Sequence, residues 1–222
     1  AAVTCLGLGY RNTARAHEAG SLRRRIGEGV AIVRGDKRLI GTLVITVIFN
    51  VFAWPFTSMI PVIGQDHLGL GPGGIGVLAS MDGLGAFAGA IGIALGATPA
   101  RYARLYLGGT AGYLALLPIF AFVSAPLLAG CTLLMTGVAS AAFTIMQSTL
   151  IYLLAPQETR SRVFGVLSVC IGMGPIGFVH LGLLADAIGP SAAVATVAVE
   201  GMIALALTFR YWRFVLRAAA AA

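Results

Sequence analysis

Charged side chains are scarce in this sequence. Only 10% of the 222 residues are Asp, Glu, Lys or Arg, and 58% are hydrophobic. A soluble domain has about 25% charged and 45 to 50% apolar residues. The mean hydropathy is +0.92. The core of a soluble domain of this size is too small to bury so many apolar side chains. The composition therefore excludes an ordinary soluble domain and makes lipid the expected solvent.

Cysteine is also rare, and its placement excludes two kinds of site. The three cysteines, Cys5, Cys131 and Cys170, lie in apolar stretches without a CxxC spacing. Neither a disulfide framework nor a zinc site is indicated by such a pattern. We expect these residues to pack as small apolar side chains, and we expect no metal and no cofactor.

The net charge of +7 raises the question of nucleic acid binding. A nucleic acid surface needs its basic residues clustered on one polar face, with reading elements beside them. Here the basic residues lie between apolar runs. The sequence therefore predicts no nucleic acid partner and a lipid bilayer in its place.

Long apolar runs separated by Gly and Pro dominate the chain. A membrane-spanning helix needs about 20 mainly apolar residues. Runs of this length occupy 39–63, 75–97, 102–123, 126–155, 163–188 and 191–209. We therefore predict an all-α, polytopic membrane protein of six transmembrane helices. The connections are so short that consecutive helices are expected to be antiparallel neighbours.

The basic residues predict the orientation, because cytoplasmic loops are enriched in Lys and Arg. All 15 of them precede the first run, follow the last, or lie between the second and third or the fourth and fifth. They are Arg11, Arg15, Arg23, Arg24, Arg25, Arg34, Lys37, Arg38, Arg101, Arg104, Arg160, Arg162, Arg210, Arg213 and Arg217. We expect both termini in the cytoplasm and a multi-pass protein of a bacterial inner membrane.

This pattern predicts that the chain has three parts. Residues 1–38 are predicted to be a cytoplasmic linker, whose stretch 22–38 mixes apolar and basic residues as a helix on an anionic leaflet does. Residues 39–209 form the six-helix domain, and 210–222 form a cytoplasmic tail. The sequence begins at Ala1 with a short apolar stretch, so we expect an upstream half.

Polar residues recur every four positions in the first and fourth runs, which places them on one face of each helix. One hypothesis is that both faces line a water-filled substrate cavity. The alternative is helix packing through small residues whose hydroxyls bond to their own backbone. The candidate cavity residues are Thr46, Asn50, Thr136, Ser140, Thr144 and Gln147.

Ionisable residues inside the runs are candidates for proton coupling. Asp at mid-helix costs about 2.5 to 3.5 kcal/mol to insert. At 1.5 Å per residue, Asp82 lies about 10 Å from the outer start of the second run, and His180 lies at a similar outer depth. Both are candidate proton-coupling sites, and a structural polar contact is the alternative for each. Glu200 in the sixth run has no polar stripe around it.

Glycines recur along the second run, including a GxxxG at Gly85 and Gly89, which predicts close packing against another helix. Gly172, Gly174 and Gly177 match GxGxxG by letter. A dinucleotide site needs a preceding strand, and here the motif lies inside an apolar run with Pro175. We expect a kinked helix there.

Two alternatives to a transporter remain open. An intramembrane protease has a nucleophilic Ser in a GxSG context or paired Asp with GxGD. Neither Ser140 nor Asp82 lies in such a context, so no catalytic residue is expected and the chain is predicted not to be an enzyme. The other alternative is a non-transporting membrane fragment or assembly subunit.

Two stretches carry a resemblance to a known family. They are IGEGVAIVRGDKRL at 26–39, and PQETRSRV at 156–163 leading to Gly174-Pro175 and LADAIG at 184–189. In these stretches, and in hydropathy and loop placement along nearly the whole chain, the sequence resembles the multidrug and siderophore efflux branch of the major facilitator superfamily.

The resemblance implies the second half of a twelve-helix transporter, built as two inverted three-helix repeats. It implies an N-terminal six-helix half as partner, a small-molecule substrate that is drug-like or siderophore-like, and proton-coupled efflux by an antiporter. The first helix of each repeat would line the cavity and the second would face the other half. The family's loop after the second helix corresponds to GATPARYAR at 96–104, which lacks the acidic residue.

Overall fold

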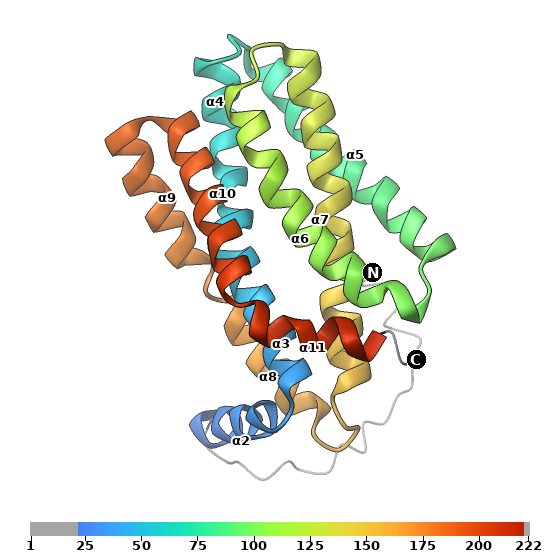
Figure 1. Cartoon of the computed structure of the whole chain (residues 1–222). Helices are drawn as coiled ribbons and strands as arrows, with labels where there is room; N and C mark the ends of the chain where they lie inside the picture. The colour runs from blue at the N-terminus through green and yellow to red at the C-terminus, as the bar shows by residue number, and fades with distance from the viewer. Residues whose placement is uncertain (1–21, 220–222) are drawn as a thin grey trace, which may run out of the picture.

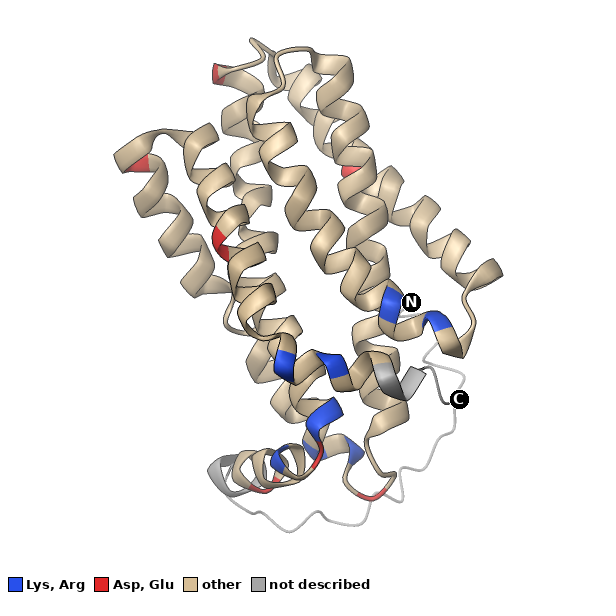
Figure 2. Ribbon diagram, in the orientation of Figure 1, with Lys and Arg blue, Asp and Glu red and all other residues tan. Residues whose placement is uncertain are grey.

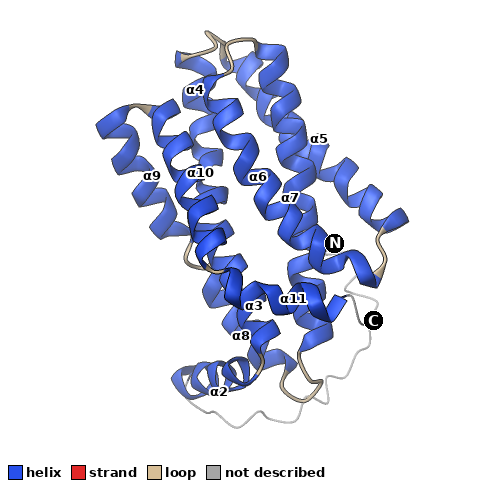
Figure 3. Ribbon diagram, in the orientation of Figure 1, coloured by secondary structure: helices blue, strands red, loops and turns tan. Residues whose placement is uncertain are grey.

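The computed structural model describes residues 22–219, and within this range every regular element is helical (Figure 3). Six segments are long and apolar enough to cross a membrane. They are Lys37–Asp66, Pro72–Gly96, Pro99–Phe122, Pro126–Leu154, Arg160–Ile188 and Pro190–Leu207. The predicted all-α, six-helix membrane fold is confirmed.

Four of the spans are single helices, and two are interrupted. The single helices are α5 (Pro72–Gly96), α6 (Pro99–Phe122), α7 (Pro126–Leu154) and α10 (Pro190–Leu207). The first span consists of α3 (Lys37–Ile48), η1 (Phe49–Ala53), η2 (Trp54–Met59) and α4 (Ile60–Asp66). The fifth consists of α8 (Arg160–Ile171) and α9 (Gly174–Ile188). Each of the four single helices begins with Pro, because an N–H in the first turn of a helix has no partner within the helix and its loss costs little.

The spans pack around α6 and α7 (Figure 1). α7 packs along both α5 and α6, while α10 packs along α6 and α9. α5 makes its long interface with α7 and none of comparable extent with α6, its neighbour in sequence. The expectation that all consecutive helices are antiparallel neighbours is therefore wrong for this pair.

Glycine explains why α5 prefers α7. A Cβ on Gly85 would overlap the carbonyl oxygen of Leu134, and one on Gly89 would lie 3.0 Å from the Cα of Val138. On the facing helix, a Cβ on Gly137 would overlap the carbonyl oxygen of Asp82. Small residues on both sides let the two backbones approach closely. The predicted close packing through Gly85 and Gly89 is confirmed.

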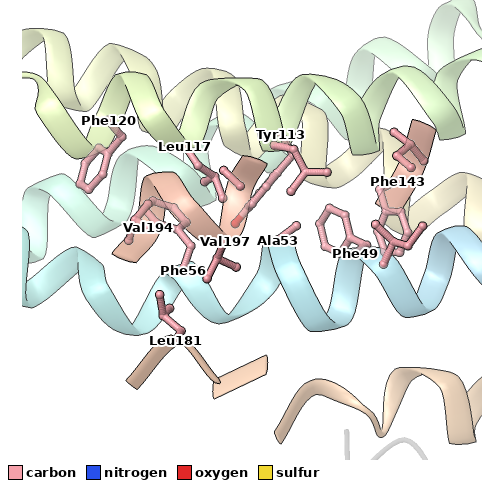
Figure 4. Close-up of a cluster of buried hydrophobic side chains, with 14 of the residues drawn as sticks. Phe49, Ala53, Phe56, Tyr113, Leu117, Phe120, Phe143, Leu181, Val194 and Val197 are labelled. Carbon is pink, nitrogen blue, oxygen red and sulfur yellow. The ribbon is translucent and has the colours of Figure 1, made fainter. Parts of the chain in front are cut away.

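Aromatic rings fill the centre of the bundle (Figure 4). Phe49 stacks on Phe143 with ring centroids 3.7 Å apart, and it lies 5.0 Å from the ring of Tyr113. Farther along, Phe56 meets Phe120 edge-on at 5.2 Å. The first span therefore contributes the rings that join α6 and α7 into one core.

Two amphipathic helices run across one end of the bundle (Figure 1). α2 (Leu22–Gly35) packs against α8, where the Glu28 carboxylate lies 3.3 Å from the Arg162 guanidinium. α11 (Phe209–Ala219) packs against α3. The described Lys and Arg residues gather at this end (Figure 2).

Asp36 separates α2 from the first span. Its carboxylate accepts hydrogen bonds from the backbone N–H and guanidinium of Arg38, and so caps the N-terminus of α3. Partial burial alone would raise the pKa of Asp36, but its hydrogen bonds to Arg38 outweigh this and hold the pKa below its usual value. The carboxylate therefore stays charged where the chain enters the first span.

Candidate functional site

The first span loses regular α-helical geometry near its middle. Phe49–Ala53 forms a π-helix and Trp54–Met59 a 3₁₀-helix. Pro55 and Pro61 lie in this region, and each lacks the N–H that would continue the α-helical ladder. Local π and 3₁₀ turns keep the backbone hydrogen bonded within a membrane helix that contains Pro. Such turns are frequent at functional sites and hinges, so this part of the span is a candidate site.

The fifth span is interrupted as well, between Ile171 and Gly174. The break contains Gly172 and Met173, and Pro175 follows in the first turn of α9. This is the region where GxGxxG occurs by letter, and it lies within a helical span without any strand. The predicted kinked helix is confirmed.

The two interruptions touch one another. A Cβ on Gly174 would lie 2.9 Å from the Trp54 ring, and one on Gly177 would overlap the carbonyl oxygen of Val51. The Trp54 ring also meets Phe178 edge-on at 5.2 Å. Gly on α9 therefore gives the irregular backbone of the first span the room it needs. In secondary transporters, interrupted helices that meet near mid-membrane form substrate and ion sites.

Replacing Gly177 with Leu is expected to separate the two interrupted spans. The Cβ of the new side chain would overlap the Val51 carbonyl oxygen and lie 2.6 Å from Pro55 Cγ. Overpacking of this kind costs about 1 to 3 kcal/mol. Gly182→Leu, also on α9, is the matched control because its Cβ meets nothing within 4 Å. Thermal unfolding in detergent micelles should show a lower midpoint for Gly177→Leu only, and equal midpoints would contradict the close contact.

A buried polar network joins the first span to α6 and α7. The Gln147 amide donates to Thr46 Oγ1 at 3.1 Å, and the Thr46 and Tyr106 hydroxyls are 2.8 Å apart. The Tyr106 hydroxyl also donates to the carbonyl oxygen of Thr42 at 2.8 Å. Asn50 donates to the Thr46 carbonyl oxygen at 2.9 Å. The structure thus brings Thr46, Asn50 and Gln147 together.

The six candidate cavity residues divide by exposure. Thr46, Asn50, Thr136 and Gln147 are buried within this bundle, Ser140 is half-buried and Thr144 is exposed. The buried members already satisfy each other or their own backbone, as Thr136 does with Leu133. Cavity lining stays a prediction for the set, and Ser140 and Thr144 are the members open to a ligand in this conformation.

Asp82 lies at the α5–α7 interface. Its Oδ1 accepts a hydrogen bond from Thr136 Oγ1 at 3.1 Å, and the side chain is half-buried. In the described part of the chain, no Lys, Arg or His lies within ion-pair distance of this carboxylate. A carboxylate at membrane depth with a single neutral donor is costly in its charged form.

His180 is paired with a residue that the sequence analysis left aside. Its Nε2 lies 2.7 Å from Oε2 of Glu200, which joins α9 to α10. Both side chains are 37% exposed on the surface of the bundle. The two residues lie at similar distances on either side of the tight Gly189-Pro190 connection. Residues at equal distances from a tight turn lie at equal depth on two antiparallel helices. The sequence therefore contains a signal from which the contact between His180 and Glu200 could have been predicted.

Asp82 and His180 belong to different helix pairs. Asp82 lies between α5 and α7, whereas His180 lies between α9 and α10. The structure therefore does not bring the two predicted proton-coupling residues together. Each has its own partner, and their roles stay predictions.

A groove opens between α5, α6 and α7 at the end where the basic residues gather. It has a volume of about 470 Å³ and contains Gly92 and Gly96 of α5 and Arg101 of α6. α5 leans away from the bundle at this end (Figure 1). The groove is continuous with Gly89 and Val138, so it follows the α5–α7 interface toward Asp82.

Among residues 22–219, no group of three or more His, Cys, Asp or Glu side chains could hold a metal ion. Comparison of the chain with protein-family models, with curated proteins and with solved structures finds no match.

Proposed function

We propose that this polytopic membrane protein is one half of a secondary active transporter that exports a small molecule in exchange for protons. The observation that carries the proposal is the contact between the interrupted first and fifth spans at Gly174 and Gly177. Secondary transporters build their substrate and ion sites from interrupted helices. Two interrupted spans that pack on each other within one bundle fit that use.

The major facilitator resemblance fits this proposal. It implies that the six spans are two inverted repeats, and that the polar residues of the first and fourth spans lie along the substrate pathway. Thr144 on α7 is exposed in the chain, as a residue that faces a pathway shared with a second half would be. The substrate class that the resemblance favours is a drug-like or siderophore-like molecule.

The partner in this proposal is a second six-helix half that packs against α5. Only 17% of the most apolar part of α5 is buried. Its exposed residues include Val77, Leu84, Phe87 and Leu95. In the family, the second helix of the repeat faces the other half, and α5 occupies that position.

The orientation follows from the basic end of the bundle, which we place in the bacterial cytoplasm. In a background without the native cysteines, a cysteine at Gln65 or Ser124 is expected to react with an impermeant thiol reagent added outside intact cells. A cysteine at Arg101 is expected to react only after the membrane is permeabilised. Gln65, Ser124 and Arg101 are all exposed on the protein surface, so access depends on the side of the membrane. The reverse labelling would invert the topology.

Dye efflux tests transport in cells. Cells that express the complete reading frame, with its upstream half, are loaded with ethidium, and loss of fluorescence is followed. Proton-coupled export predicts that fluorescence falls faster than in cells carrying Gly177→Leu. It also predicts that a protonophore removes this difference. Equal loss in the presence and absence of the protein, across a panel of lipophilic dyes and siderophores, would contradict it.

A further inference from the structure

At the basic end of the bundle, two cations contact one aromatic ring. Lys37 Nζ, from α3, lies 5.2 Å from the centroid of the Phe214 ring, and the Arg213 guanidinium, from α11, lies 5.0 Å from the same centroid. Like charges brought to one ring repel each other. The contact of each cation with the ring recovers only about 0.5 to 1 kcal/mol at an exposed site.

A third cation, Arg210, lies one helical turn before Arg213. Its guanidinium lies 4.7 Å from the Tyr211 ring centroid and donates to the Tyr211 hydroxyl at 2.6 Å. Within residues 22–219, no carboxylate lies within ion-pair distance of Lys37, Arg210 or Arg213. Arg38 and Arg162 are different, because Asp36 and Glu28 pair with them.

The cluster is held in place by packing. A Cβ on Gly41 of α3 would lie 2.7 Å from the Tyr211 carbonyl oxygen and 2.8 Å from Val215, so α11 is pressed against α3. The Trp212 indole donates to the Leu205 carbonyl oxygen at 2.8 Å, which fixes the turn between α10 and α11. The three cations are therefore presented by a docked helix and by the first residue of a membrane span.

The position of the cluster indicates which class of anion it can meet. Lys37 begins the first span and α11 follows the end of the sixth, so the cluster lies where hydrocarbon gives way to headgroups. Trp and Tyr are enriched at this level, and Trp212 and Tyr211 lie beside the cations. Anionic lipids attract basic residues near the surface with about 1 kcal/mol each.

We propose that Lys37, Arg210 and Arg213 form a binding site for the phosphate headgroup of an anionic phospholipid, with Phe214 and Tyr211 at its base. The lipid tails lie along the outside of the bundle and the phosphate bridges α3 to α11. The site ties the C-terminal helix to the first span through a lipid. The proposal depends on membrane insertion alone and holds whether or not the chain transports anything.

Native mass spectrometry of the full chain tests the site, in micelles doped with phosphatidylglycerol or phosphatidylcholine. We expect preferential binding of phosphatidylglycerol, lowered about 30-fold in Arg210→Gln/Arg213→Gln and about fivefold in Lys37→Gln. The matched control Arg101→Gln/Arg104→Gln removes two cations from the same end and should change binding less than about twofold. Phosphatidylcholine binding should not respond to any of these substitutions.

Three outcomes would overturn the proposal. Equal binding of the two lipids by the unsubstituted chain would show that no anionic site exists, even if the variants fail to fold. Equal losses in the Arg101/Arg104 control would show diffuse charge attraction. Displacement of phosphatidylglycerol by millimolar inorganic phosphate would assign the cluster to a free phosphate. A micelle has no sides, so none of these results depends on the proposed orientation.

Discussion

Asp82→Asn is expected to abolish proton-driven transport by the complete protein and to leave substrate binding largely intact. The carboxylate lies at the α5–α7 interface with Thr136 as its hydrogen-bond donor. Asn keeps the size and can still accept that bond, but it cannot take up or release a proton. The expected loss of gradient-driven flux is at least about 100-fold, and binding of the same substrate should change less than about threefold.

The control for Asp82 is Thr136→Val, which removes the neutral donor and keeps the carboxylate. A moderate loss of transport is expected, because an unpaired buried acceptor costs about 1 to 3 kcal/mol. Ser80→Ala is a second control, since its hydroxyl donates to the Gly76 carbonyl oxygen on the same helix. Unchanged proton-driven transport in Asp82→Asn would assign the coupling carboxylate to the other half.

Removing either member of the His180–Glu200 pair is expected to destabilise the fold, and removing both is expected to restore most of the loss. The two groups are 2.7 Å apart at membrane depth. Truncating one partner leaves the other without compensation, which costs about 3 to 5 kcal/mol for a fully buried pair. The pair is 37% exposed on this chain, so a smaller cost of about 2 kcal/mol is expected for His180→Leu or Glu200→Leu.

A double-mutant cycle measures this coupling. Unfolding midpoints are compared for His180→Leu, Glu200→Leu and the double variant in the same detergent. Recovery in the double variant of more than half of the summed losses would establish the pair as a unit. Additive losses would show that the two residues act separately.

The spans could be predicted from the sequence because hydropathy is a property of each run by itself. Gly85 and Gly89 likewise predicted a close helix contact, since small residues at this spacing let two helix backbones approach. They did not predict which helix would be the partner. The choice of α7 over α6 depends on Gly137 and on the direction in which α5 leaves its loop, and these are three-dimensional properties.

The polar stripe of the first span shows a different limit. Its spacing correctly places Thr42, Thr46 and Asn50 on one face, but spacing does not say what that face meets. In the structure Thr46 bonds to Tyr106 and Gln147, and Asn50 bonds back to its own helix. Spacing alone does not identify a role for Tyr106 or a partner for Glu200, because each depends on a neighbour from another span.

The measurement that tests the central claim most directly is flux in sealed vesicles that contain the complete reading frame and a folded, oriented protein. A dye or siderophore exported in cells is offered with and without an imposed proton gradient. The account predicts substrate movement against the proton flow when the gradient is present, and little without it. The same flux in both conditions would contradict proton coupling, and no flux in either would contradict transport itself.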